Sequence, residues 1–138
     1  MTFTDPEVAA VGVASWAPAG EPVPQTVTRE HADVDRAVAE GRTDGFARLV
    51  LGARGRILGA TVVGPRAGES LAELTLAVHK GLTATDLAGT IHPYPTYGDG
   101  PWGAGVAVVQ QRLSTPTVRR LTGAILAVRR AWTARRTR

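Results

Sequence analysis

The sequence GFARLVL at residues 45–51, followed by GARG at residues 52–55 and RILGATVV at residues 56–63, decides the fold of this chain. The two outer segments are rich in β-branched and other apolar side chains, which favour strands. A short connection that contains glycine joins them, and this arrangement predicts an antiparallel hairpin. Gly64-Pro65 ends the second strand, because proline lacks the amide hydrogen that a strand ladder uses.

Two more strands are predicted before the hairpin. Residues 8–13 form a short apolar run, and residues 25–29 (QTVTR) alternate β-branched and polar side chains. The prolines and glycine between these runs break any long element and indicate a loop. Residues 33–40 predict one or two helical turns, which Gly41 ends.

Helices are predicted after the hairpin. Residues 67–80 form the clearest one, because apolar side chains recur at steps of three and four and Gly81 stands at the C-cap position. A short helical turn is expected near Thr85-Asp86, an irregular segment at residues 91–100, and a helix at residues 103–113. Strands followed by helices, without regular βαβ alternation, predict an α+β fold: an antiparallel β-sheet with helices packed on one face.

The charge of the chain is unevenly distributed. Residues 1–99 carry eight basic and twelve acidic residues, whereas residues 100–138 carry eight arginines and no acidic residue. This difference indicates that the C-terminal segment has a separate role. We therefore expect one domain at residues 1–115 and an Arg-rich amphipathic helix at residues 116–138.

The final helix has an apolar seam with arginines on its flanks. The seam consists of Val118, Leu121, Ile125, Val128 and Trp132. Such a helix can dock on the body of the protein or on neighbouring domains, which is the role we expect. Binding to an anionic membrane surface or to nucleic acid is the alternative, and it would make the chain a basic binding module. Nucleic acid is the less favoured partner, because only one aromatic side chain lies in this helix.

Several classes of site are not expected in this chain. It contains no cysteine, which excludes disulfides, thiolate metal sites and a redox dithiol within it. We expect no signal peptide and no membrane span. The three histidines do not have metal-ligand spacing, so no metal site is predicted. His31 is expected to be exposed, and His79 to lie at a helix C-terminus, where the helix dipole favours it.

Three sequence blocks resemble a known family. The first is FTDPEVAAVG at residues 3–12. The second comprises TDGF at residues 43–46, ILGA at residues 57–60 and GPRAGE at residues 64–69, and the third is HPYPTYGD at residues 92–99. In this order and spacing they resemble the C-terminal dimerisation (interface) domain of the FAD-dependent pyridine nucleotide-disulfide oxidoreductases, which include dihydrolipoamide dehydrogenase and mercuric reductase.

The resemblance implies a domain that pairs with itself. In this family the domain follows an FAD domain and an NAD(P) domain, supplies most of the subunit interface and completes the active site of the partner. The resemblance begins near Met1, and no G-x-G-x-x-G fingerprint opens a βαβ unit here. We therefore expect a homodimer that binds no cofactor within this chain and is not catalytic alone. Its parent is expected to be a cytoplasmic flavoprotein oxidoreductase with FAD and NAD(P), which takes part in cell redox homeostasis.

The third block implies the site residues. Most members have a catalytic His before the Pro-Thr pair and a Glu that orients it. Aligning Pro95-Thr96 on that pair puts Tyr94 at the His position and Asp99 at the Glu position, with His92 two residues earlier. Mercuric reductases also have Tyr there, and a phenol is a poor base at neutral pH. The resemblance thus implies a disulfide, metal or quinone-type acceptor, with the metal or quinone type favoured over lipoamide or glutathione. It also implies a cis peptide bond between Tyr94 and Pro95.

Overall fold

The computed structural model describes residues 1–13 and 24–136. They divide into two compact units, Met1–Val108 and Val109–Arg138. The first unit contains the predicted sheet and the helices that cover it. The second contains the final helix, α5 (Pro116–Arg136), at the place of the helix expected at residues 116–138, of which residues 137–138 lie outside the described part. No helix among the described residues is both long and apolar enough to cross a membrane.

The sheet of the first unit has four strands in the order β1-β4-β3-β2, and every pairing is antiparallel. The strands are β1 (Val8–Gly12), β2 (Gln25–Glu30), β3 (Phe46–Leu51) and β4 (Ile57–Val63). The predicted hairpin is confirmed, since β3 pairs with β4 through a short 3₁₀ turn. Both N-terminal strands are also confirmed, and they pair with the two sides of this hairpin.

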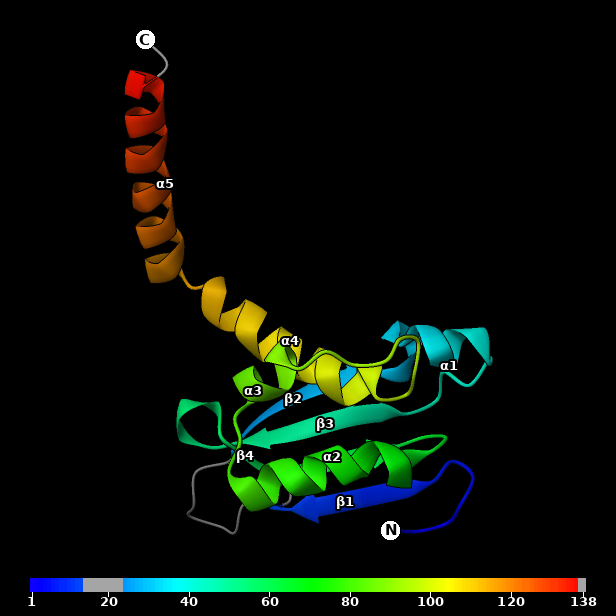
Figure 1. Ribbon diagram of the computed structural model, residues 1–138. Coiled ribbons are helices and arrows are strands. Elements are labelled where there is room, and N and C mark those ends of the chain that lie inside the picture. The colour runs from blue at the N-terminus through cyan, green and yellow to red at the C-terminus, as the bar shows by residue number, and fades with distance from the viewer. Residues whose placement is uncertain (14–23, 137–138) are drawn as a thin grey trace. The chain divides into compact units, whose positions relative to one another are not determined.

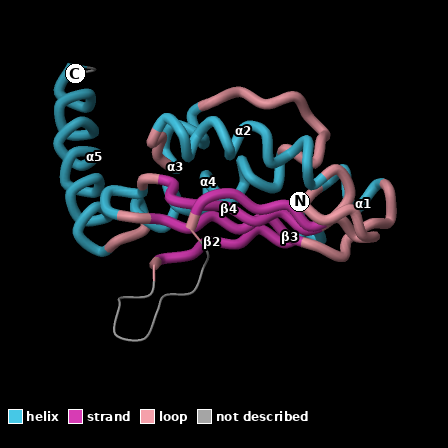
Figure 2. The backbone as a smooth tube through the Cα atoms, turned by 90° about the horizontal axis from the view of Figure 1, so that it is seen from below, coloured by secondary structure: helices cyan, strands magenta, loops and turns pink. Residues whose placement is uncertain are grey.

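Helices cover one face of the sheet (Figure 1 and Figure 2). Helix α2 (Ala67–Lys80) has the predicted bounds, and Gly81 ends it in the left-handed conformation with φ of 67°. Buried side chains of α2, such as Leu74 and Ala77, join the main core together with Leu49 and Val62 of the sheet. The expected α+β architecture, with an antiparallel sheet and helices on one face, is therefore confirmed.

Two short helices flank the larger ones. Helix α1 (Asp35–Ala39) follows a 3₁₀ turn and ends before Gly41, which has φ of 65°. Helix α3 (Ala84–Gly89) begins at a capping box, because the Thr83 hydroxyl accepts a hydrogen bond from the Asp86 amide and the Asp86 carboxylate accepts one from the Thr83 amide. The helical turn expected near Thr85 is confirmed, and Thr83 is its cap.

Helix α4 (Asp99–Leu113) begins four residues before the predicted start at residue 103. Proline and glycine suggested an irregular segment up to residue 100. Pro101, however, lies in the first turn, where its missing amide hydrogen has no intrahelical partner to lose. The Asp99 carboxylate also accepts a hydrogen bond from the Thr96 amide at 2.9 Å, which fixes the chain entering the helix.

His31 is buried, and the expectation that it would be exposed was wrong. The ring fills space that two glycines leave open: a Cβ atom at Gly64 would lie 2.2 Å from His31 Cε1, and one at Gly45 would lie 2.9 Å from Nδ1. The Tyr97 ring packs beside it, with the two ring centroids 5.5 Å apart. Burial depended on glycines distant in sequence, which local polarity could not reveal.

Candidate functional site

Two of the predicted site residues, His92 and Tyr94, lie on the segment that joins α3 to α4, and Asp99 is the first residue of α4. This segment contains a cis peptide bond between Tyr94 and Pro95, as expected. Thr96 makes two hydrogen bonds here, since its hydroxyl donates to the Pro93 carbonyl at 3.0 Å and its amide donates to the Asp99 carboxylate at the start of α4. These contacts give the segment a defined conformation between its two helices.

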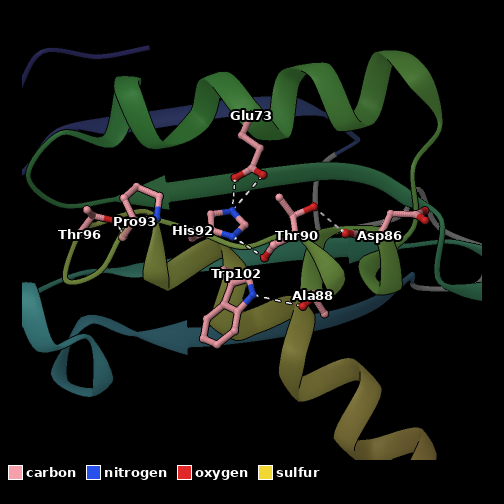
Figure 3. A network of polar contacts seen from close by, with 8 residues as sticks. All are labelled: Glu73, Asp86, Ala88, Thr90, His92, Pro93, Thr96 and Trp102. Carbon is pink, nitrogen blue, oxygen red and sulfur yellow. Dashed lines mark hydrogen bonds and ion pairs between the residues drawn. The ribbon is translucent and has the colours of Figure 1, made fainter.

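His92 is held from two sides, and its side chain is only 10% exposed. Nδ1 lies 3.0 Å from the Thr90 carbonyl oxygen, and Nε2 lies 2.8 Å and 3.0 Å from the two carboxylate oxygens of Glu73 on α2 (Figure 3). A carbonyl and an ionised carboxylate both accept hydrogen bonds. Both contacts are therefore hydrogen bonds when both ring nitrogens carry hydrogen, or when Glu73 is itself protonated. A neutral ring beside an ionised Glu73 donates from one nitrogen only, so its tautomer then decides which of the two contacts is a hydrogen bond.

Tyr94, in contrast to the largely buried His92, is 71% exposed. Its hydroxyl donates a hydrogen bond to the Asp35 carboxylate at the start of α1. That hydrogen bond, the charge of Asp35, partial desolvation and the charge of Asp99 all raise the pKa of the Tyr94 phenol. The phenol therefore stays protonated at neutral pH, where it can donate a hydrogen bond but is a poor general base.

The structure brings His92, Tyr94 and Asp99 to the wall of one pocket of about 350 Å³. Trp102 of α4 forms another side, and its indole nitrogen donates to the Ala88 carbonyl at 3.3 Å. The remaining lining residues are Ala88, Gly89, Thr90 and Ile91. The pocket thus combines an apolar floor with a phenol, a carboxylate and the edge of an imidazole.

Three residues of this site were not predicted from the sequence: Glu73, Asp35 and Trp102. Glu73 lies 19 positions before His92, and Asp35 lies 59 positions before Tyr94. Neither separation follows a local period, and both carboxylates stand in segments that predict ordinary amphipathic helices. No signal in a single sequence identifies these pairings.

The described residues do not form a dinucleotide-binding unit. Every strand pairing among them is antiparallel, so no βαβ crossover carries a glycine-rich loop to a bound pyrophosphate. Within residues 1–13 and 24–136, no group of three or more His, Asp or Glu side chains could hold a metal ion. The residues that the structure describes therefore do not fit FAD or NAD(P).

Comparisons with known proteins agree with this arrangement. The family model described as "Pyridine nucleotide-disulphide oxidoreductase, dimerisation domain" matches residues 1–104. Dihydrolipoyl dehydrogenase of Geobacillus stearothermophilus is 41% identical over 101 residues, which cover 72% of this chain and 22% of that protein. Dihydrolipoyl dehydrogenase of Chlamydia trachomatis is 40% identical over 101 residues, again 72% of this chain and 22% of that protein.

Solved structures also match the fold of this chain. The crystal structure of LpdA from Mycobacterium tuberculosis aligns with a TM-score of 0.69 and 29% identity, over 77% of this chain and 24% of that one. The flavoprotein disulfide reductase RclA from Escherichia coli aligns with a TM-score of 0.62 and 23% identity, over 70% of this chain and 22% of that one, which indicates a shared fold. The chain spans about a fifth of the length of the curated relatives it matches.

Proposed function

Because the chain belongs to the dimerisation-domain family of the pyridine nucleotide-disulphide oxidoreductases, we propose that it forms a homodimer and serves a flavin-dependent NAD(P)H oxidoreductase. FAD and NAD(P) would be held by other domains of that enzyme, since the described residues offer no unit that fits them. The chain has no cysteine to act as a redox dithiol. Alone it would therefore associate without catalysing electron transfer. A cytoplasmic location is part of the same proposal.

The observation that carries this proposal is an exposed apolar surface on α2 and beside the site. Leu76 of α2 is 55% exposed and Ile91 is 97% exposed. Between α2 and α3 lies a groove of about 220 Å³, lined by Glu73, Leu76, Ala77, Leu82, Asp86, Leu87 and Thr90. Removing such apolar surface from water favours association, at about 25 cal/mol per Å². We propose that α2 and residues 91–99 form the dimer surface.

The same surface would bring the site to the partner subunit. His92, Tyr94 and Asp99 line a pocket next to Ile91. In an enzyme dimer these residues would face an active site assembled from the partner's domains. We propose that Tyr94 donates a hydrogen bond there, with Asp35 and Asp99 setting its protonation state, while His92 fixes the segment to α2 through Glu73.

This role favours one class of electron acceptor. A base that serves a dithiol must accept a proton near neutral pH, and the raised pKa of Tyr94 opposes that. We therefore propose that the parent enzyme reduces a metal ion or a quinone-type acceptor. The two curated relatives described above are dihydrolipoyl dehydrogenases by name, so the proposed acceptor differs from theirs.

Sedimentation equilibrium of charge variants tests the proposed surface. Leu76→Glu and Ile91→Glu are expected to weaken self-association at least tenfold, because each places a charge in a desolvated apolar contact. Val13→Glu is the matched control, since Val13 is also about half exposed but lies next to β1, outside the proposed surface. A dimer that survives both test variants would contradict the surface. Circular dichroism would verify that each variant is folded.

A further inference from the structure

Helix α5 presents an apolar line along its length. Val118, Ile125 and Trp132 are spaced seven residues apart, and residues at this spacing lie on nearly the same side of an α-helix. Ile125 and Trp132 are each 58% exposed. The helix belongs to the second unit and lies outside residues 1–104, which match the dimerisation-domain family. The proposed self-association surface on the first unit therefore does not account for it.

The charge around this line has one sign. Residues 100–138 contain eight arginines and no acidic residue, so no Asp or Glu side chain of this segment offsets their charge. Arg120, Arg129 and Arg130 are exposed. Basic side chains beside an apolar stripe suit an anionic bilayer, because the stripe enters the acyl region while the guanidinium groups remain among the phosphates. Trp132 adds a side chain that prefers the boundary between lipid and water.

We propose that α5 is a peripheral membrane-binding helix that lies in the headgroup region of an anionic phospholipid bilayer. Val118, Ile125 and Trp132 enter the membrane, and the arginines contact lipid phosphates. Residues 116–138 thus form a binding element separate from the domain at residues 1–115. The helix lies on the surface and does not span the bilayer, since it has six arginines in its 21 residues.

Other occupants of this face fit the observations less well. A second copy of α5 would bring arginines against arginines with no acid to compensate. The phosphates of a nucleic acid would pair with the arginines, but the apolar line offers only one aromatic side chain on which a base could stack. An acidic protein surface, such as the body of this protein or a neighbouring domain that the sequence alone favours, would use both the charge and the apolar line. The uniform positive charge, however, carries no alternating pattern that would fix a register on such a surface. These occupants become outcomes of the test.

The first test is flotation of the full chain with phosphatidylcholine vesicles, with and without phosphatidylglycerol. Binding to the vesicles that contain phosphatidylglycerol is expected to be at least tenfold stronger, because each basic residue near an anionic surface adds about fivefold. Raising the salt concentration should weaken it, because ions screen this attraction. Equal binding to both vesicle types, or binding to neither, would overturn the proposal. Binding to duplex DNA or to polyglutamate without vesicle binding would assign the helix to another partner and would equally overturn it.

Paired variants test the orientation of the helix. Ile125→Ser is expected to weaken vesicle binding roughly tenfold or more, because it removes a side chain buried in the acyl region. Leu126→Ser is the matched control: Leu126 is 45% exposed but lies about 100° around the helix from Ile125, so binding should persist. Arg129→Glu with Arg130→Glu should abolish binding, and Arg129→Lys with Arg130→Lys should retain it. Equal loss from Ile125→Ser and Leu126→Ser would contradict the inserted face.

This inference does not depend on the proposed dimer or on its electron acceptor. Vesicle binding can be measured while self-association is followed separately by sedimentation. A monomer that binds anionic vesicles would overturn the dimer and leave the membrane helix standing. A dimer that does not bind anionic vesicles would overturn the membrane helix and leave the proposed dimer standing.

Discussion

His92 Nε2 lies 2.8 Å from a carboxylate oxygen of Glu73, and this contact ties the segment between α3 and α4 to helix α2 (Figure 3). Both residues face the proposed dimer surface: Glu73 lines the groove between α2 and α3, and His92 lines the site pocket. The pair therefore links the helix that we propose for self-association to the residues that we propose for the partner's active site.

A double-mutant cycle measures this link. We expect His92→Ala and Glu73→Gln to have a coupling free energy of about 1 kcal/mol, because the pair is partly buried and in direct contact. Urea denaturation at fixed protein concentration gives the free energies of unfolding of the native chain, the two single variants and the double variant. Glu69→Gln is the control on the same helix, and its coupling to His92 should be close to zero. A zero coupling for Glu73 would mean that the contact contributes nothing to stability.

His31 should make the stability of the fold depend on pH. Burial lowers the pKa of His31, and the nearby charge of Glu30 opposes this only in part. Below pH ~6.5 the unfolded chain binds a proton that the folded chain resists, so the unfolded state binds more protons there. The contribution of His31 is thus fully present above pH ~6.5 and is lost as the pH falls toward its lowered folded-state pKa.

The measurement is the free energy of unfolding of the native chain and of His31→Met between pH 5 and 8. The difference between the two curves should change below pH ~6.5 and stay constant above it. Methionine can fill the space without titrating. A constant difference over the whole range would show that His31 does not titrate differently in the folded and unfolded states.

Gly64 should tolerate no side chain. Its φ of 142° disfavours other residues, and an added Cβ would lie 2.2 Å from His31 Cε1. Gly64→Ala should therefore lower the free energy of unfolding by more than about 2 kcal/mol. Gly89→Ala is the control, because nothing lies within 4 Å of its added Cβ and alanine favours helix α3 by up to about 1 kcal/mol. If thermal or urea unfolding gives Gly64→Ala and Gly89→Ala the same free energy of unfolding, the packing described around His31 is contradicted.

Tyr94 should titrate at a higher pH than an ordinary tyrosine. The chain has two tyrosines, so Tyr97→Phe leaves Tyr94 as the one phenol that an absorbance titration detects. Asp35→Asn should lower the pKa of Tyr94 in that background, because it removes the accepting carboxylate and its charge. Asp33→Asn is the control, and it should change the pKa of Tyr94 less than Asp35→Asn does. An unchanged Tyr94 titration in Asp35→Asn would remove the basis for treating the phenol as a fixed donor.

The sequence predicted those parts of the fold that local periodicity controls. The β3–β4 hairpin and α2 each follow a regular pattern of apolar residues with glycine at the ends, and both formed as predicted. His31 departs from its prediction because its burial depends on Gly45 and Gly64, which leave space for the ring from distant positions. The start of α4 departs because proline is compatible with a first helical turn.

The site was predictable only through the family resemblance. His92, Tyr94 and Asp99 lie close together in sequence, so one motif predicted all three as candidate site residues, and their chemical role stays a prediction. Glu73 and Asp35 reach them from other elements, and only the tertiary fold brings these two carboxylates within contact. Trp102 follows Asp99 on α4 and lines the same pocket. Residue types and spacing can indicate which side chains carry chemistry, but not which distant carboxylates orient them.

The most direct test of the central claim is light scattering on the purified chain after size exclusion, with an absorbance scan through the flavin region. We expect a colourless particle with twice the 14.5 kDa mass of the chain. A monomer at concentrations where dimeric enzymes remain associated would contradict self-association as its function. A yellow particle would contradict the claim that this chain holds no flavin.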